Sequence, residues 1–159
     1  KLGLYFQKEK MEKERNELSM LINHAADGIY SMNSEGIVLT WNPTCERIYG
    51  WKSHEIIGKN IEIIFTDDKL GEYIKLKKKL LEGKSIEHYE AERVRKDGKM
   101  IWVRNAVAPI KNDAGEVSGA CVVVHDISSQ KALDTTLIKS EEKLRIFLEL
   151  TKEWVWELD

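Results

Sequence analysis

The sequence predicts an α+β domain built from short helices and antiparallel strands. Two short β-rich runs flank a turn-forming link near residue 35, glycine-ended helical segments fill the middle of the chain, and three longer runs with a period near two follow residue 85. Consecutive strands with short links form antiparallel pairs. These patterns together predict one sheet-containing domain with attached segments.

The composition agrees with one folded domain and argues against nucleic acid as its partner. Of 159 residues, 42% are hydrophobic, and 25 basic side chains balance 27 acidic ones. This content supports a core and argues against intrinsic disorder and against nucleic-acid binding through bulk positive charge.

No apolar run approaches the roughly 20 residues that cross a bilayer. The two cysteines lie far apart in sequence, which indicates a reducing compartment, so we expect a cytoplasmic segment.

Residues 1–20 are predicted to form an N-terminal connecting helix. Leu4, Met11 and Leu18 are spaced seven residues apart, and Leu21 follows three residues later. This sparse heptad pattern agrees with a coiled coil and equally with a solvated lead-in helix. Both interpretations remain open.

A β-hairpin and two short helices follow. Gly28–Met32 and Ile37–Trp41 are β-rich and are joined by a turn of Asn, Ser, Glu and Gly. Asn42 is a suitable N-cap and precedes a proline, which favours the first helical position. Each of the two expected helices, 44–49 and 53–57, is followed by glycine, the residue that commonly ends a helix.

A longer helix and three strands complete the predicted domain. A short helix is expected at 61–65, and apolar residues at helical spacing predict a longer one over 70–81, whose lysines form either a solvated face or a docking patch. A C-terminal connecting helix is expected over 128–150. Turns rich in Asp, Asn and Gly separate three predicted strands, at 85–95, 100–111 and 117–126.

The two ends of the chain resemble each other. Residues 18–22 match 144–148, and residues 27–33 match 153–159, at a common offset of 126 residues. This period is far longer than the roughly 20–50 residues of solenoid repeats. It indicates tandem domains, with residues 151–159 as the start of a second domain that is truncated just after its first strand, expected at 153–159. Chance similarity between amphipathic segments is the alternative.

A series of short motifs runs through residues 21–127. They are Asp27-Gly-Ile, the turn at 33–36, Trp41-Asn-Pro, Tyr49-Gly-Trp, Glu55-Ile-Ile-Gly, Lys96-Asp-Gly, Trp102, Pro109, the turn at 113–115 and Asp126-Ile-Ser. In this order and spacing they resemble the PAS sensory domain. The resemblance implies a five-stranded antiparallel sheet in the order 2-1-5-4-3, with helices over one face around a small pocket and further helices at both ends.

No catalytic motif is present in the sequence. It has no Walker-type phosphate loop, no His-Glu-x-x-His zinc motif, no Gly-x-Ser-x-Gly elbow, and no phosphoacceptor-histidine helix or ATP-binding domain. We therefore predict that this segment is not an enzyme and holds no metal. Because PAS units in series are common in sensor histidine kinases, the resemblance implies a parent kinase whose catalytic domains lie elsewhere.

The resemblance also allows flavin and haem cofactors to be considered residue by residue. Flavin-adduct light sensors carry a cysteine directly after a Gly-x-Asn, where this chain has Ile61, and an amide on two strands, where it has Val103 and Val124. Haem-binding members commonly take a histidine from the long helix, which has none here. No cofactor is therefore predicted, and a noncovalently held flavin or haem stays an alternative.

Strand alternation and the family alignment predict which side chains face the pocket. Either Arg93 and Asn105 receive a small anionic or polar ligand, or Arg93 pairs with Glu62 or Glu72 while Asn105 bonds to the backbone. The other predicted pocket residues are mostly apolar, and the full set is Phe65, Leu70, Tyr73, Ile74, Tyr89, Ala91, Arg93, Val103, Asn105, Val107, Ala120, Val122 and Val124.

The leading hypothesis is a signal-input and relay module. A change in the pocket would shift the fifth strand, which leads through Asp126, Ile127 and Ser128 into the exit helix. Asp126 is the expected coupling residue, because it can cap that helix or pair with a neighbouring side chain. The rival is a structural spacer without a ligand, in which the flanking helices form a homodimer. The expected partners are a small-molecule ligand and neighbouring PAS and effector domains of the same chain, and not nucleic acid.

Overall fold

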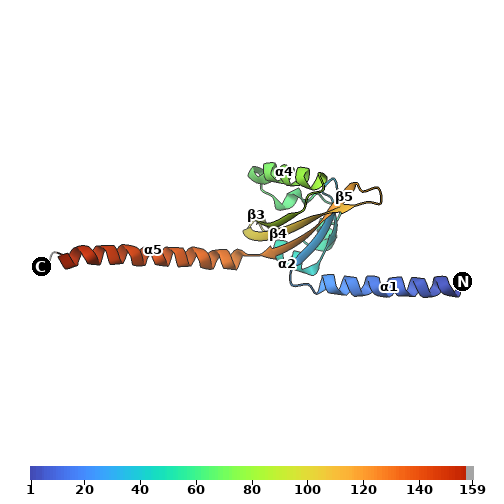
Figure 1. Cartoon of the computed structure of the whole chain (residues 1–159), viewed down its shortest axis with the longest axis horizontal. Helices are drawn as coiled ribbons and strands as arrows, with labels where there is room; N and C mark the ends of the chain where they lie inside the picture. The colour runs from blue at the N-terminus through green and yellow to red at the C-terminus, as the bar shows by residue number, and fades with distance from the viewer. Residues whose placement is uncertain (157–159) are drawn as a thin grey trace. The chain divides into compact units, whose positions relative to one another are not determined.

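The computed structural model describes residues 1–156, with side chains as far as Lys152. Its strands form one antiparallel sheet in the order β2-β1-β5-β4-β3 (Figure 1). This confirms the predicted α+β class and strand order. The strands are β1 (Gly28–Asn33), β2 (Val38–Trp41), β3 (Ile86–Val94), β4 (Met100–Lys111) and β5 (Val117–Asp126).

The helices lie close to where the sequence predicts them. The N-terminal helix continues three residues beyond its predicted end, and a short 3-10 helix that the sequence analysis did not separate precedes the long helix. The helices are α1 (Leu2–Asn23), α2 (Pro43–Tyr49), α3 (Ser53–Ile56), the 3-10 helices η1 (Ile61–Ile64) and η2 (Asp67–Lys69), α4 (Leu70–Leu81) and α5 (Ser128–Trp156).

Local hydrogen bonds explain the hairpin between β1 and β2. The Asn33 side-chain oxygen accepts from the backbone N–H groups of Glu35 and Ile37, at 3.0 and 2.9 Å. Gly36 then adopts a φ of 91°, a left-handed conformation that glycine reaches without steric cost. The turn predicted from residue types is thus built by an asparagine and a glycine.

Asn42 joins three elements through one buried amide. Its Oδ1 caps α2 by accepting from Cys45 N at 2.9 Å, and it also accepts from Ile29 N at 3.0 Å. Its Nδ2 donates to the carbonyls of Ile22 and Asp27, at 3.0 and 3.1 Å. The end of α1, the start of β1 and the start of α2 are therefore connected by a side chain that is 3% exposed.

The core lies between the sheet and the helices from α2 to α4, which cover one of its faces. Three aromatic rings form its centre near β1, with Tyr30 and Trp41 at a centroid distance of 5.1 Å and Trp41 and Tyr49 at 5.3 Å. Tilted pairs at such distances add to the free energy of apolar burial. This packing holds the helices against the sheet and leaves α4 over β4 and β5 (Figure 1).

The exit helix differs from the prediction. Contacts divide the chain into Lys1–Asp126 and Ile127–Asp159. The connecting helix was expected at 128–150 and a strand at 153–159. Instead, α5 stays helical to Trp156, so the predicted strand is wrong for residues 153–156. A helix satisfies its own backbone groups, whereas a strand needs a neighbour to pair with. Residues 157–159 lie outside the described residues.

The helices of residues 1–156 include none that combines the length and the hydropathy needed to cross a bilayer.

Candidate functional site

A small cavity lies between α4 and the buried face of the sheet. Its volume is about 40 Å³, which is room for water or for a molecule of a few non-hydrogen atoms. Most of its wall is apolar. The wall consists of Tyr30, Met32, Ile61, Phe65, Tyr73, Leu76, Lys77, Leu80, Tyr89, Arg93, Asn105, Val107 and Val122.

Helical spacing decides which side of α4 forms the wall. Tyr73, Leu76 and Leu80 lie three and four positions apart, so they share one face of the helix. Ile74, predicted to face the pocket, is 65% exposed because one residue further along turns the side chain about 100° away. Leu70 is half-buried outside the wall. Of the three α4 residues predicted to face the pocket, Tyr73 therefore lies in the wall, and Leu70 and Ile74 do not.

The structure brings seven of the predicted pocket residues to the cavity. Ala91, Val103 and Val124 are buried in the core beside it without forming its wall, and Ala120 lines a smaller neighbouring cavity. The predicted residues that do line the cavity are Phe65, Tyr73, Tyr89, Arg93, Asn105, Val107 and Val122.

Six lining residues were missed by the sequence reasoning. Tyr30 and Met32 alternate along β1 as inward-facing residues do, and Leu76 and Leu80 follow the apolar period of α4, so a signal existed for these four. Lys77 was treated as part of the lysine run. Ile61 begins the short helix expected at 61–65 and stands where flavin-adduct sensors have a cysteine, and neither feature predicts a place in the wall. The missed residues are Tyr30, Met32, Ile61, Leu76, Lys77 and Leu80.

Arg93 is buried, and its charge is matched by Glu72. The Arg93 side chain is 3% exposed, and its Nη1 lies 2.9 Å from Glu72 Oε1 on α4. The same nitrogen donates to the Glu92 carbonyl at 2.7 Å, and the guanidinium carbon lies 4.0 Å from the centre of the Phe65 ring. A buried charge needs such partners, and of the two acidic residues expected, the structure supplies Glu72.

Tyr89 extends this polar group on β3. Its burial is the main reason that the pKa of Tyr89 is raised to about 12, and hydrogen bonding with the Glu72 carboxylate adds to the effect. The phenol is therefore neutral at pH 7. Arg93, Glu72 and Tyr89 together form a polar group, here called the Arg93 group, whose two charges compensate each other.

Asn105 differs from Arg93, because it has a polar atom left without a partner. The residue is 6% exposed on β4, and its Oδ1 is buried and accepts no hydrogen bond in the described residues. Of the backbone bonds that one alternative expected of Asn105, its oxygen therefore makes none in the described residues. The Tyr73 hydroxyl is likewise buried without a partner, and burial raises its pKa. The Tyr73 hydroxyl lies next to Gly36, which lines the smaller neighbouring cavity, so Asn105 Oδ1 is an open polar group of the main cavity.

The chain leads directly from the cavity to the exit helix. Val122 of β5 lies in the cavity wall. The strand ends four residues later at Asp126, Ile127 follows, and α5 begins at Ser128. The three residues predicted to couple the domain to its exit helix therefore span the junction between these two elements.

Comparison with known proteins identifies the fold family. A family model described as PAS fold matches residues 16–127. The chain belongs to the PAS family. This PAS domain is itself a non-catalytic module, and it contains every lining residue of the cavity.

Two curated relatives are signalling kinases. The signal transduction histidine-protein kinase AtoS of Escherichia coli is 26% identical over 133 residues, which are 84% of this chain and 21% of AtoS. The methanogenesis regulatory histidine kinase FilI of Methanothrix harundinacea is 24% identical over 143 residues, which are 90% of this chain and 16% of FilI. The PAS domain therefore resembles a small part of much longer proteins.

Solved structures show the same fold at low identity. A PAS domain from Colwellia psychrerythraea has a TM-score of 0.65 at 20% identity and covers 75% of this chain and 98% of its own. An RNA-binding light-oxygen-voltage receptor has a TM-score of 0.70 at 19% identity, and the match covers 80% of this chain and 37% of the receptor. These likenesses agree with the sheet order and show the fold alone.

The wall of this PAS domain does not fit an adduct-forming flavin. Ile61 is buried in the wall where such sensors have their cysteine, and it has no thiol. Cys45 and Cys121 are free and lie outside the wall. Among the side chains described, which end at Lys152, no group of three His, Cys, Asp or Glu is arranged to hold a metal.

Proposed function

We propose that this PAS domain is a signal-input and relay module of a sensor protein. One observation carries the proposal: β5 both lines the cavity, through Val122, and leads into α5. A change of packing at Val122 would therefore act on the strand that ends at Asp126. The exit helix would respond as a shift between two populated conformations.

The relatives support a kinase as the effector. AtoS and FilI are both named histidine kinases. We propose that the complete protein is a sensor histidine kinase in which this PAS domain, as a cytoplasmic segment, passes its signal to neighbouring domains. The sequence match between 27–33 and 153–159 is the basis for proposing a second PAS domain, and its first four residues belong to the end of α5.

The relay is tested in the complete protein by a matched pair of substitutions. Val122 is buried at the cavity, whereas its neighbour Val123 is 38% exposed because alternate strand residues point to opposite faces. Val122→Ile should change the rate of autophosphorylation, and Val123→Ile should not. Adding Asp126→Ala to Val122→Ile should abolish the change, whereas Asp134→Ala should not. Equal effects of the two valine substitutions, or no effect of Asp126→Ala, would contradict the relay.

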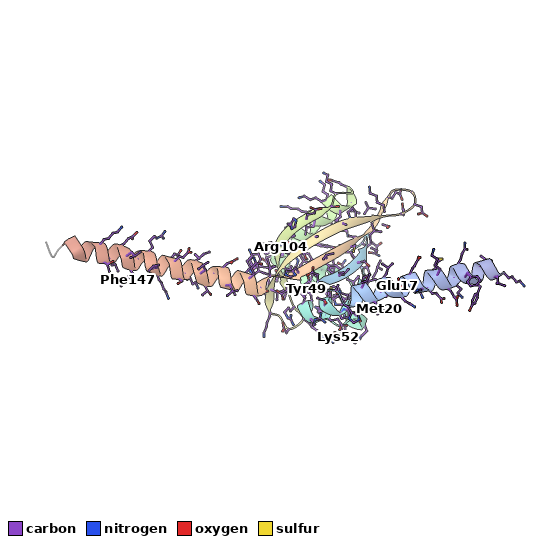
Figure 2. All side chains as sticks on the ribbon, turned by 60° about the horizontal axis from the view of Figure 1, so that its bottom comes forward. Glu17, Met20, Tyr49, Lys52, Arg104 and Phe147 are labelled. Atoms are coloured by element: carbon purple, nitrogen blue, oxygen red, sulfur yellow. The ribbon has the colours of Figure 1, made fainter. Side chains whose placement is uncertain are left out.

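Exposed apolar residues on the flanking helices support a second function, homodimerisation. On α5, Leu133, Leu137, Leu144 and Phe147 are exposed at close to heptad spacing, and Figure 2 labels Phe147 on this helix. Such a row is typical of a helix that packs against another helix. Leu4, Met11, Leu18 and Leu21 form a comparable exposed row on α1.

Sedimentation of the full chain tests the dimer. We expect a dimer that Leu137→Glu and Leu144→Glu together convert to a monomer, because charges at the helix contact would be desolvated. Lys139→Glu, on the same helix and also exposed, should leave the dimer intact. A monomeric wild-type chain would contradict this function. A dimer whose kinase output ignores Val122→Ile would favour the spacer over the relay.

A further inference from the structure

The charge balance of the cavity wall limits what the cavity can bind. Arg93, the buried cation, is already paired with Glu72 at 2.9 Å. Lys77, the other cation of the wall, donates through Nζ to the Glu35 carbonyl at 3.1 Å on the exposed side of α4. An anion brought to Arg93 would compete for this buried cation with the Glu72 carboxylate, whose side chain is 27% exposed.

Asn105 contributes an unpartnered hydrogen-bond acceptor to the wall, which favours a ligand that donates a hydrogen bond. Asn105 lines the cavity from β4, and its Oδ1 is buried and accepts no hydrogen bond in the described residues. A buried acceptor without a donor costs free energy, which a bound donor recovers. The rest of the wall is mostly apolar and favours an uncharged body.

We propose that the cavity binds a small uncharged molecule that donates a hydrogen bond to Asn105 Oδ1, as a primary amide or an alcohol does. This proposal rests on the sensing role and gives that role a ligand class. A volume of about 40 Å³ limits the molecule to a few non-hydrogen atoms. The Arg93 group forms one side of the site and stays paired when the molecule binds.

Two probes of nearly the same shape separate charge from size. Propionamide is neutral and donates through its NH2 group, whereas propionate is an anion that only accepts. Titration of the full chain with each probe, followed by amide chemical shifts in NMR, should give saturable shifts around Asn105 with propionamide. Propionate should bind at least about tenfold more weakly.

A substitution of similar shape tests the hydrogen bond. Asn105→Leu removes the acceptor and should weaken propionamide binding by about tenfold or more. It should not lower the melting temperature, because an apolar group replaces an unpartnered polar one. Asn16→Leu, on the exposed surface of α1, is the matched control and should leave binding unchanged.

Three outcomes would overturn the ligand class. They are equal or tighter binding of propionate, unchanged propionamide affinity in Asn105→Leu, and absence of binding by both probes, which would leave water as the occupant. The first and third need no variant and so do not depend on its folding. If Val122→Ile still alters kinase output, the relay stands and only the ligand class fails. If propionamide binds as expected but Val122→Ile leaves the rate of autophosphorylation unchanged, the relay fails and the ligand class stands.

Discussion

At Gly28 the backbone of β1 leaves no room for a side chain. A Cβ added there would lie 2.5 Å from Val124 Cγ1 and 2.9 Å from Cys45 Sγ, closer than nonbonded atoms can approach. The glycine of the Asp27-Gly-Ile motif therefore lets β1 lie against β5 and α2. The reason for this glycine is close packing and not a special backbone conformation, because its φ is not positive.

We expect Gly28→Ala to lower the free energy of unfolding by about 1–3 kcal/mol, because neighbouring core atoms must move. Urea denaturation measures this. Gly71→Ala is the control, since Gly71 lies in α4 with no heavy atom within 4 Å of an added Cβ. It should raise the free energy of unfolding by up to about 1 kcal/mol through helix propensity. A Gly28→Ala protein as stable as the wild type would contradict the packing argument.

Between elements, one carboxylate holds α2 to the start of α3. Glu46 Oε1 accepts from Ser53 N at 2.8 Å, and Oε2 lies 3.1 Å from Lys52 Nζ. The hydrogen bond from the Ser53 backbone is the main reason that the pKa of Glu46 is lowered. The folded state therefore favours the ionised carboxylate more than the unfolded chain does.

This lowered pKa predicts a pH-dependent stability. The contribution is fully present above the unfolded pKa of about 4.3 and is lost as the pH falls through the lower folded value. Glu46→Gln should therefore reduce the free energy of unfolding at pH 7, and the difference from wild type should shrink as the pH falls below about 4.

Urea denaturation at several pH values measures this difference. Glu17→Gln, at a position that projects from α1 (Figure 2), should match the wild type at each pH. A Glu46→Gln difference that stays constant from pH 7 to about pH 2 would show that the carboxylate charge is not involved.

For the molecule as a whole, Cys45 reports on the integrity of the core. It is fully buried, and burial raises the pKa of its thiol to about 12. Cys121 is half-buried on β5, and burial also raises its pKa. Because the thiolate is the reactive form, both cysteines should react slowly in the folded protein, and Cys45 should react more slowly.

A thiol reagent should therefore label Cys121 first, and Cys45 only when the core opens. In a Cys121→Ser variant, the rate of labelling should rise with urea in proportion to the population of globally unfolded chain. Mass spectrometry of the labelled protein follows this. Rapid labelling of Cys45 without urea would mean that α2 opens independently of the rest of the domain.

The features that sequence reasoning predicted are those governed by neighbours along the chain. Asn33 and Gly36 build the hairpin turn, and Asn42 and Gly50 begin and end α2, because backbone sterics and short-range hydrogen bonds act within a few residues. The period of two in the last strands correctly placed β3, β4 and β5. The order of the strands came from the family resemblance, since periodicity alone does not state which strands pair.

Long-range packing was needed for the features of the site. Both Ile74 and Leu76 fit an apolar period in α4, and the position of the helix over the sheet leaves Ile74 exposed and Leu76 half-buried in the cavity wall. The pairing of Arg93 with Glu72 joins β3 to α4, and the missing partner of Asn105 depends on every element around the cavity. Such contacts join residues distant in sequence, so their geometry follows from the folded arrangement and not from local pattern.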